Sequence, residues 1–313
     1  MARGSRLVHR TDDQELTYSY ATTSADRISD LQAYMDDQDR AGKLSDHKVF
    51  REYLKSARYA LPEGVANPKS LIALAVETVP MRISVSWQGR SQDVLVPPQY
   101  YSTGMTPETL RDIVTSGVIG ADGHEVERMR HGHMKLLAVR TGLGRYGRNN
   151  ICYVEGMGTC ITLYAFVTDF EFPEDEWTDV AMMESCADCR ICRESCPTGA
   201  IPDEGFVLDV AKCIPLYNEV DGDFPSWLPE DAHNALVGCM RCQLPCPGNR
   251  DVLTRTGRLE GLSESEVAAI LSDAPEEEAV RSAADKLRID VTDGELRQVI
   301  ARNLRALLRE ETA

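Results

Sequence analysis

The alternation of apolar and polar positions changes along the chain and predicts a mixed α/β first part. Helices are expected at 24–38, 46–60, 106–114 and 124–140, and strands at 70–79, 82–87, 93–97, 150–154 and 160–169. Ser24 is a plausible N-cap, and Thr106 followed by Pro107 is typical of a helix start. Residues 1–20 are expected to form an irregular or extended lead-in.

The last sixty or so residues have a different pattern, which predicts a small helical tail. Helices are expected at 263–273, 276–287 and 293–311. The first of them begins with a capping-box pattern, in which Ser263 is followed three residues later by Glu266. An acidic, proline-containing connector, EFPEDEWTD, separates this tail and the cysteine-rich segment before it from the α/β part.

Eight of the ten cysteines fall between these two parts. The first run has the spacing Cys-x2-Cys-x2-Cys-x3-Cys-Pro, which is typical of bacterial ferredoxins that bind [4Fe–4S] clusters. In such runs the fourth cysteine serves the other cluster. We therefore expect one cluster to be bound by Cys186, Cys189, Cys192 and Cys246, and the other by Cys196, Cys213, Cys239 and Cys242.

Two other uses of these cysteines are less favoured. Pairs of CxxC motifs can bind zinc, but zinc does not account for the triple run or for the Cys-Pro endings. A disulfide framework is disfavoured by the close packing of the cysteines and by the lack of a secretory signal. Cys152 and Cys160 lie in apolar stretches outside the runs and are expected to be buried, inert thiols.

Composition narrows the classes of partner. The 313-residue chain has a net charge of −16, which disfavours broad nucleic-acid binding because that requires basic patches. An acidic surface would instead suit docking to a basic redox partner. The absence of an export signal or a long apolar run predicts a cytoplasmic protein without membrane insertion.

A glycine motif precedes the cysteine runs at Gly142, Gly144 and Gly147. It matches G-x-G-x-x-G, but a dinucleotide-binding motif should follow a strand and open a helix. Here a helical pattern precedes the motif and an apolar strand pattern follows it, so we reject that reading. We expect the glycines to allow close backbone approach to something bulky.

The blocks TGLGRYGRNN, CADCRICRESCPTGAI, AKCIPLYNEVDGDFP and GCMRCQLPCPGNRDV, in that order, resemble epoxyqueuosine reductases, whose relatives include the reductive dehalogenases. The resemblance is strong over 135–252, looser over 45–134, and fades in the tail. It implies an α+β fold with a nitroreductase-like α/β domain at 1–175, a ferredoxin-like two-cluster domain at 176–252 and a helical tail at 253–313.

The same resemblance implies the cofactors and the chemistry. In that family the α/β domain binds a cobalamin, which receives electrons from the clusters and carries out a reductive step. By resemblance, Gly142, Gly144 and Gly147 would lie against the corrinoid, and Arg145 and Arg148 would contact its polar periphery. A ferredoxin or flavodoxin is the expected electron donor.

The proton donor is the point at which this chain departs from the family. The family uses an aspartate upstream of the glycine block, and Arg128 occupies about that position here. Local groups that could donate a proton instead are Tyr101, Glu127, His131 and His133. Each also has a structural reading, as a packing aromatic or a solvated side chain.

Three functions therefore stay open. The favoured one is a two-cluster, cobalamin-dependent reductase of a small molecule or modified nucleoside. The second is epoxyqueuosine reduction on tRNA, which the acidic composition, the short tail and the absent aspartate make a less favoured reading. The third is an electron-transfer or reductive-activation protein with no substrate of its own.

Overall fold

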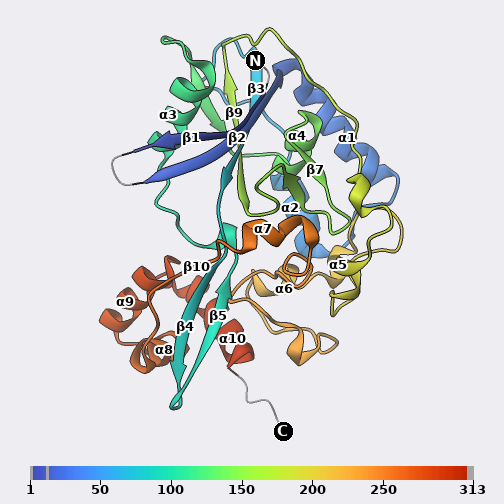
Figure 1. Cartoon of the computed structure of the whole chain (residues 1–313). Coiled ribbons are helices and arrows are strands. Elements are labelled where there is room, and N and C mark those ends of the chain that lie inside the picture. Colours follow the sequence, from blue (N-terminus) through green and yellow to red (C-terminus); the bar gives the residue numbers. More distant parts are fainter. Residues whose placement is uncertain (1–2, 12–13, 309–313) are drawn as a thin grey trace. The chain divides into compact units, whose positions relative to one another are not determined.

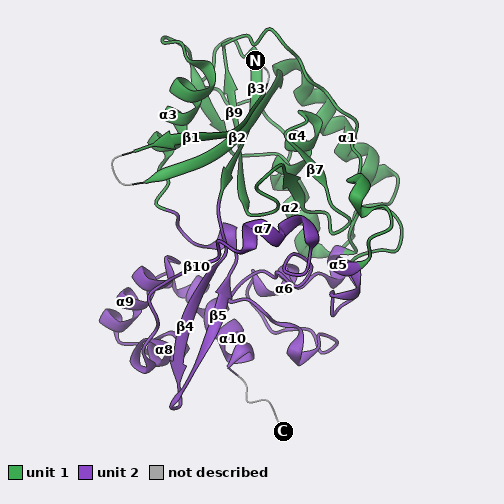
Figure 2. Ribbon diagram, viewed as in Figure 1, with its two compact units in different colours: residues 1–77, 104–190, 201–209 green, residues 78–103, 191–200, 210–313 purple. Residues whose placement is uncertain are grey.

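The computed structural model describes residues 3–11 and 14–308, which form two compact units that interleave along the chain (Figures 1 and 2). The first unit comprises 1–77, 104–190 and 201–209, and the second comprises 78–103, 191–200 and 210–313. The fold is mixed α+β, as expected. The three consecutive domain ranges expected from the sequence stay a prediction, and the two units divide the chain in a different way.

The first unit is built on a five-stranded sheet with the order β1-β2-β3-β9-β6, in which every neighbouring pair is antiparallel. Its strands are β1 (Arg3–Arg10), β2 (Glu15–Ser24), β3 (Ser70–Glu77), β9 (Ile161–Thr168) and β6 (Val126–Met129). Its helices are α1 (Ile28–Arg40), α2 (Lys48–Ser56), α3 (Pro107–Asp112), a π-helix (Ile113–Ile119) and α4 (Met134–Arg140). A small hairpin, β7 (Gly144–Tyr146) and β8 (Cys152–Val154), follows α4.

Strand β3 has apolar residues at every position from Leu71 to Val76 because both of its faces are buried there. Leu71, Ala73 and Ala75 contribute to one hydrophobic core together with α1 and α4. Ile72, Leu74 and Val76 contribute to a second core together with α3 and the π-helix. A strand between two packed layers needs apolar residues at every position rather than at alternate ones, which explains the continuous run in the sequence.

The second unit joins the early hairpin to the helical tail. Its sheet has the order β10-β4-β5, with β4 (Met81–Trp87), β5 (Arg90–Val96) and β10 (Gly257–Arg258). Its helices are α5 (Ile191–Glu194), α6 (Pro215–Asn218), α7 (Arg250–Leu253), α8 (Glu264–Leu271), α9 (Glu277–Leu287) and α10 (Gly294–Leu307). The hairpin and the last three helices share one hydrophobic core, so the hairpin packs with the tail rather than with the large sheet.

Several elements differ from the sequence prediction. The expected lead-in at 1–20 forms two sheet strands over its described residues, because Tyr18, Tyr20 and their alternate neighbours are buried. The helix expected from residue 24 begins at Ile28, since Ser24 caps a preceding 3₁₀ turn. The helix expected at 124–140 is instead strand β6 followed by α4, with Gly132 at φ +114° between them. The segment 309–311 of the last expected helix lies outside the described residues.

The capping box at Ser263 is confirmed and extends into a buried ion pair. Glu266 is only 5% exposed and lies 2.8 Å from Lys286 Nζ. Burial alone would raise the pKa of Glu266, but Lys286, Ser282 and Ser263 donate hydrogen bonds to it and lower the pKa to about 2. The stability that this carboxylate contributes is therefore present above its usual pKa of 4.5 and is lost as the pH falls from there toward 2.

We expect Glu266→Gln to destabilise the second unit by about 1–3 kcal/mol at neutral pH, because it removes charge-assisted hydrogen bonds from a buried site. Urea unfolding measures the change. Glu278→Gln is the matched control, since Glu278 is an exposed first-turn residue of α9, and it should change stability by less than about 0.5 kcal/mol. Equal effects of the two substitutions would contradict the prediction.

Candidate iron–sulfur site and its surroundings

The eight cysteines of the two runs lie on short turns rather than on long elements. Cys186 ends a 3₁₀ turn (Glu184–Cys186), Cys192 lies in α5, and Cys213 follows a 3₁₀ turn (Val210–Lys212). Cys246 precedes Pro247, which begins another 3₁₀ turn. All ten cysteines of the chain lie in the described part and are free thiols. Short turns let closely spaced cysteines point their sulfurs in a common direction.

In the second unit the structure brings together cysteines from the two separate runs. Burial raises the pKa of Cys239 to about 11, and the nearby thiol of Cys196 acts in the same direction. The backbone N–H of Arg241 donates to Cys239 Sγ at 3.4 Å, and Thr198 Oγ1 lies 3.5 Å from Cys196 Sγ. Cys196 comes from the first run and Cys239 from the second, so their proximity fits a cluster that takes ligands from both.

A buried amide near the second run lacks an acceptor. Asn234 accepts a hydrogen bond from Met240 N–H at 3.2 Å, but its buried Nδ2 has no partner among the described residues. The sulfur atoms of a [4Fe–4S] cluster accept such hydrogen bonds. The donors and thiols in this part of the second unit therefore fit an iron–sulfur cluster.

Within 3–11 and 14–308, no group of three or more His, Cys, Asp or Glu side chains is close enough to hold a single metal ion.

Two buried asparagines connect the loops of the second cluster to the C-terminal helix. Asn218 Nδ2 donates to the Gly238 carbonyl at 2.6 Å, and the Gly238 N–H donates back to Asn218 Oδ1 at 3.0 Å. On α10, Asn303 Nδ2 donates to the carbonyls of Asn218 and Leu236 at 2.8 and 3.0 Å. Asn218 lies five residues after Cys213, and Gly238 directly precedes Cys239. The tail therefore supports the segments that carry two expected ligands.

Sequence reasoning missed this network, because a single asparagine in a helical pattern carries no signal of its long-range partners. It also missed a pairing in the second unit, where Tyr100 donates a hydrogen bond to the carboxylate of the exposed residue Glu219. Arg302 likewise donates from α10 to carbonyls of the segment after Cys213, namely those of Tyr217, Val220 and Gly222.

The glycine block forms the start of the β7–β8 hairpin, and its glycines are explained by that hairpin itself. A Cβ on Gly144 would meet Cys152 Sγ at 2.5 Å and the Tyr153 carbonyl at 2.9 Å. A Cβ on Gly147 would meet the Tyr153 ring at 2.5 Å. Both glycines thus lie in close contact with the chain's own hairpin, and their expected contact with a corrinoid stays a prediction.

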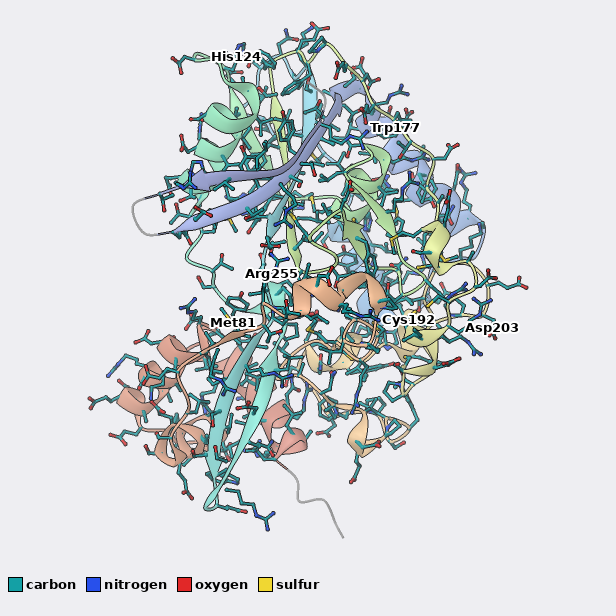
Figure 3. All side chains as sticks on the ribbon, viewed as in Figure 1. Met81, His124, Trp177, Cys192, Asp203 and Arg255 are labelled. Carbon is teal, nitrogen blue, oxygen red and sulfur yellow. The ribbon has the colours of Figure 1, made fainter. Side chains whose placement is uncertain are left out.

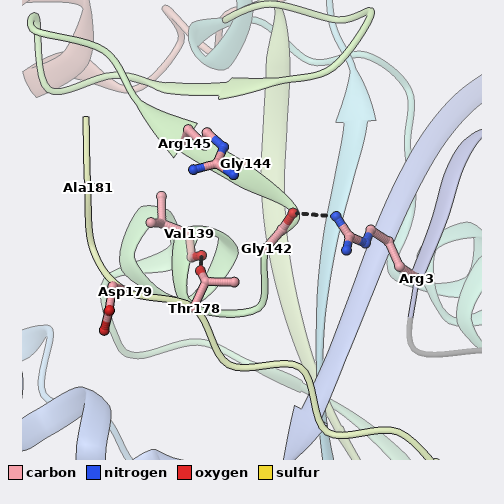
Figure 4. Close-up of a pocket in the computed structure, with 8 residues that line it drawn as sticks. All are labelled: Arg3, Val139, Gly142, Gly144, Arg145, Thr178, Asp179 and Ala181. Carbon is pink, nitrogen blue, oxygen red and sulfur yellow. Dashed lines mark hydrogen bonds between the residues drawn. The ribbon is translucent and has the colours of Figure 1, made fainter. Parts of the chain in front are cut away.

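Gly142 is different, because it lines a small pocket in the first unit (Figure 4). The pocket has a volume of about 100 Å³, and its lining includes Arg3, Arg145 and Thr178. Arg3 donates to the Gly142 carbonyl at 3.2 Å. Arg145 is exposed and has no polar partner among the described residues. Asp179 also lines the pocket, so side chains of both charges face it.

Arg148 of the same block is buried, with 3% exposure, and faces the first cysteine run. Its guanidinium donates to the backbone carbonyls of Cys186, Ala187, Cys189 and Asp203 at 2.7–3.0 Å. Asp203 is labelled in Figure 3. The structure therefore brings the glycine block and the first cluster loop together, and the expected contact of Arg148 with a corrinoid stays a prediction.

Of the four expected proton donors, Tyr101 belongs to the second unit and the other three belong to the first. Tyr101 is buried in the second unit and donates to the Val79 carbonyl at 2.8 Å. In the first unit, Glu127 lies on β6 with its carboxylate against Gly64, and His131 is exposed with Nδ1 3.0 Å from the Ser56 carbonyl. Arg128, at the position of the family's aspartate, places its guanidinium 4.8 Å from the centre of the Tyr164 ring.

His133 is partly buried in the first unit. Its ring packs edge-on against Tyr53 and Tyr59, and its carbonyl accepts from Tyr59 Oη at 2.7 Å. Burial, together with the charge of Lys135, lowers the pKa of His133 to about 4. The imidazole is therefore neutral near pH 7. Cys152 and Cys160 are buried as expected, and burial raises the pKa of Cys152 to about 12.

We expect Asn303→Ala to reduce iron binding by up to half, because it leaves two buried carbonyls of the second-cluster loops without a donor, at a cost of about 1–3 kcal/mol each. Iron and sulfide analysis after anaerobic reconstitution measures the loss. Gln298→Ala, an amide substitution at an exposed position of the same helix, should leave iron content unchanged. Full iron content in Asn303→Ala would contradict this role of the tail.

We expect the depressed pKa of His133 to make the first unit less stable in mild acid. Between pH 6.5 and 4 the unfolded chain binds a proton at this position and the folded chain does not, so stability falls with falling pH. His133→Gln should reduce the loss of unfolding free energy between pH 7.5 and 5.5 by about 1 kcal/mol relative to the unsubstituted chain. His131→Gln, at an exposed histidine two positions away, should retain the full pH dependence.

Comparison with known proteins supports the reading of the cysteine runs. A family model described as a 4Fe-4S double cluster binding domain matches residues 185–249. Epoxyqueuosine reductase from Staphylococcus aureus is 34% identical over 120 residues, which are 38% of this chain and 30% of the relative. Epoxyqueuosine reductase from Escherichia coli is 35% identical over 115 residues, which are 36% of this chain and 29% of the relative. These sequence matches thus span less than a third of those reductases.

Solved structures extend the likeness to the fold. Epoxyqueuosine reductase from Streptococcus thermophilus has a TM-score of 0.63 at 16% identity, covering 92% of this chain and 76% of the other. The Bacillus subtilis enzyme also has a TM-score of 0.63, at 18% identity and the same coverage. In the part that the structure describes, no helix has the length and apolarity needed to cross a membrane. The chain is therefore similar to epoxyqueuosine reductases in its double [4Fe–4S] cluster segment and in its fold.

Proposed function

We propose that this protein is a cytoplasmic iron–sulfur reductase in which two [4Fe–4S] clusters deliver electrons for the reduction of a small molecule or a modified nucleoside. The observation that carries the proposal is the double-cluster module at 185–249, within which Cys196 and Cys239 of separate runs lie near each other. Reduction of a closed-shell substrate takes up an electron pair. Two clusters that each hold one electron can supply that pair.

The ligand sets follow from the run spacing. One cluster takes Cys186, Cys189, Cys192 and Cys246, and the other takes Cys196, Cys213, Cys239 and Cys242. The second set lies entirely within one compact unit and is supported there by the Asn218 and Asn303 network. A ferredoxin or flavodoxin is the proposed electron donor.

The family relation supports a nitroreductase-like α/β domain and a cobalamin as the group that receives the electrons. Gly144 and Gly147 pack closely against the chain's own β7–β8 hairpin, and contact between the glycine block and the corrinoid is part of the proposal. Arg145 is the one arginine of the glycine block that is exposed and without a described polar partner. It is the member of the block best placed to meet an anionic or polar ligand.

Two further functions have specific support. One solved relative, with a TM-score of 0.59, is an epoxyqueuosine reductase with an epoxyqueuosine-modified tRNA stem loop, which favours a nucleoside in tRNA as substrate. Two features favour instead an electron-transfer protein with no substrate of its own. They are the net charge of −16 and the packing of Gly144 and Gly147 against the chain's own hairpin. Corrinoid binding and complementation of a queuosine-deficient strain separate these functions.

We expect the anaerobically reconstituted protein to contain eight irons in two [4Fe–4S] clusters, because eight cysteines supply four thiolates for each cube. Cys196→Ser should lose up to half of the iron and one of the two reduced-cluster signals in electron paramagnetic resonance. Cys152→Ala is the control, because Cys152 is a buried thiol outside the runs, and it should retain both signals. A reconstituted protein with zinc and no iron would overturn the proposal.

The same preparation tests the corrinoid. After incubation with cobalamin and desalting, the protein should retain corrinoid absorbance near one equivalent. Clusters without retained corrinoid would favour the electron-transfer function. Loss of accumulated epoxide in a complemented queuosine-deficient strain would identify tRNA as the substrate.

A further inference from the structure

Arg148 has an unusual electrostatic position in the first unit. It is 3% exposed, and no carboxylate lies within ion-pair distance of it anywhere in the described ranges. Its four hydrogen bonds all go to neutral backbone carbonyls. A buried charge without a counter-charge is costly, because the partial charges of carbonyls replace only part of its hydration.

Three of the four acceptors belong to the loop that carries Cys186 and Cys189. If these cysteines are cluster ligands, as the proposed function holds, the missing negative charge comes from the cluster. An oxidised cube with four thiolates is already anionic, and one-electron reduction adds a further negative charge. A fixed cation beside the ligand loop stabilises the reduced form more than the oxidised form.

We propose that Arg148 is a positioning residue of the first cluster, which holds its ligand loop through four backbone carbonyls and raises its reduction potential through a buried positive charge. The inference rests on the proposed cluster ligation. It gives the glycine block a role that does not depend on a corrinoid. The electron involved comes from a low-potential one-electron donor and converts the cluster from its oxidised to its reduced form, with no bond broken.

Arg190 provides a matched control in the same loop. Its Nη1 donates to the carbonyls of Ala187 and Cys189 at 3.0 and 3.2 Å, so it shares two acceptors with Arg148. Unlike Arg148, it is partly exposed to solvent. Water and salt screen its charge, so the same loss of one positive charge should have a much smaller effect on the cluster.

The test is a redox titration of the reconstituted protein, followed by electron paramagnetic resonance, with dithionite or Ti(III) citrate as the reductant. We expect Arg148→Met to make reduction of one cluster about tenfold less favourable, equivalent to about 59 mV for one electron. The potential of the other cluster should not move. Arg148→Lys keeps the charge with fewer hydrogen bonds and should stay near the unsubstituted value, as should Arg190→Gln.

Three outcomes would overturn the inference. The first is a fully loaded Arg148→Met protein whose cluster potentials are unchanged. The second is an Arg190→Gln protein whose cluster potential shifts as much as that of Arg148→Met. The third is the loss of one cluster from both Arg148→Met and Arg148→Lys. The last outcome would show that the hydrogen bonds alone matter. If Arg148→Met loses the cluster while Arg148→Lys retains it at the unsubstituted potential, the requirement for the charge is supported. Failure of the proposed function itself is distinguishable, because the unsubstituted protein would then show no cluster signals.

Discussion

Cysteine loops that wrap a metal cluster contain many backbone carbonyls and N–H groups that no regular helix or strand can pair. Buried backbone groups without partners cost free energy, so other side chains must supply the hydrogen bonds. In the first unit Arg148 donates hydrogen bonds to carbonyls of the loop at 186–189. In the second unit Asn218 and Asn303 donate hydrogen bonds to carbonyls of the segments before Cys239 and after Cys213.

This constraint explains why segments far apart in sequence are needed for one site. The helical tail contributes Asn303 from α10, and the hairpin β4–β5 packs in the same core as that helix. The tail is thus part of the support for the segments that carry Cys213 and Cys239 rather than an independent appendage. The glycine block is linked to the loop at 186–189 in the same way, because Arg148 directly follows Gly147 and donates to the Cys189 carbonyl.

Much of the site could be predicted from the sequence, because cluster ligation depends on local spacing. The runs ending at Cys196 and Cys246 predicted the double-cluster domain, and the family match over 185–249 confirms it. The strand β3 and the capping box at Ser263 could also be predicted, because both depend on the local pattern of residues. The strand β6 was not, because its short segment at 126–129 becomes a strand only by pairing with β9.

The sequence by itself determined the chemistry of the chain: thiolates in cluster spacing and an acidic balance of charge. It also determined the order of its blocks, because residue types and short spacings are local properties. Only the tertiary structure decided what the glycines approach, which carbonyls Arg148 pairs with, and that Asn303 reaches Asn218 and Leu236. Those outcomes depend on which buried polar groups need a partner, and that need arises only when distant segments pack together and exclude water.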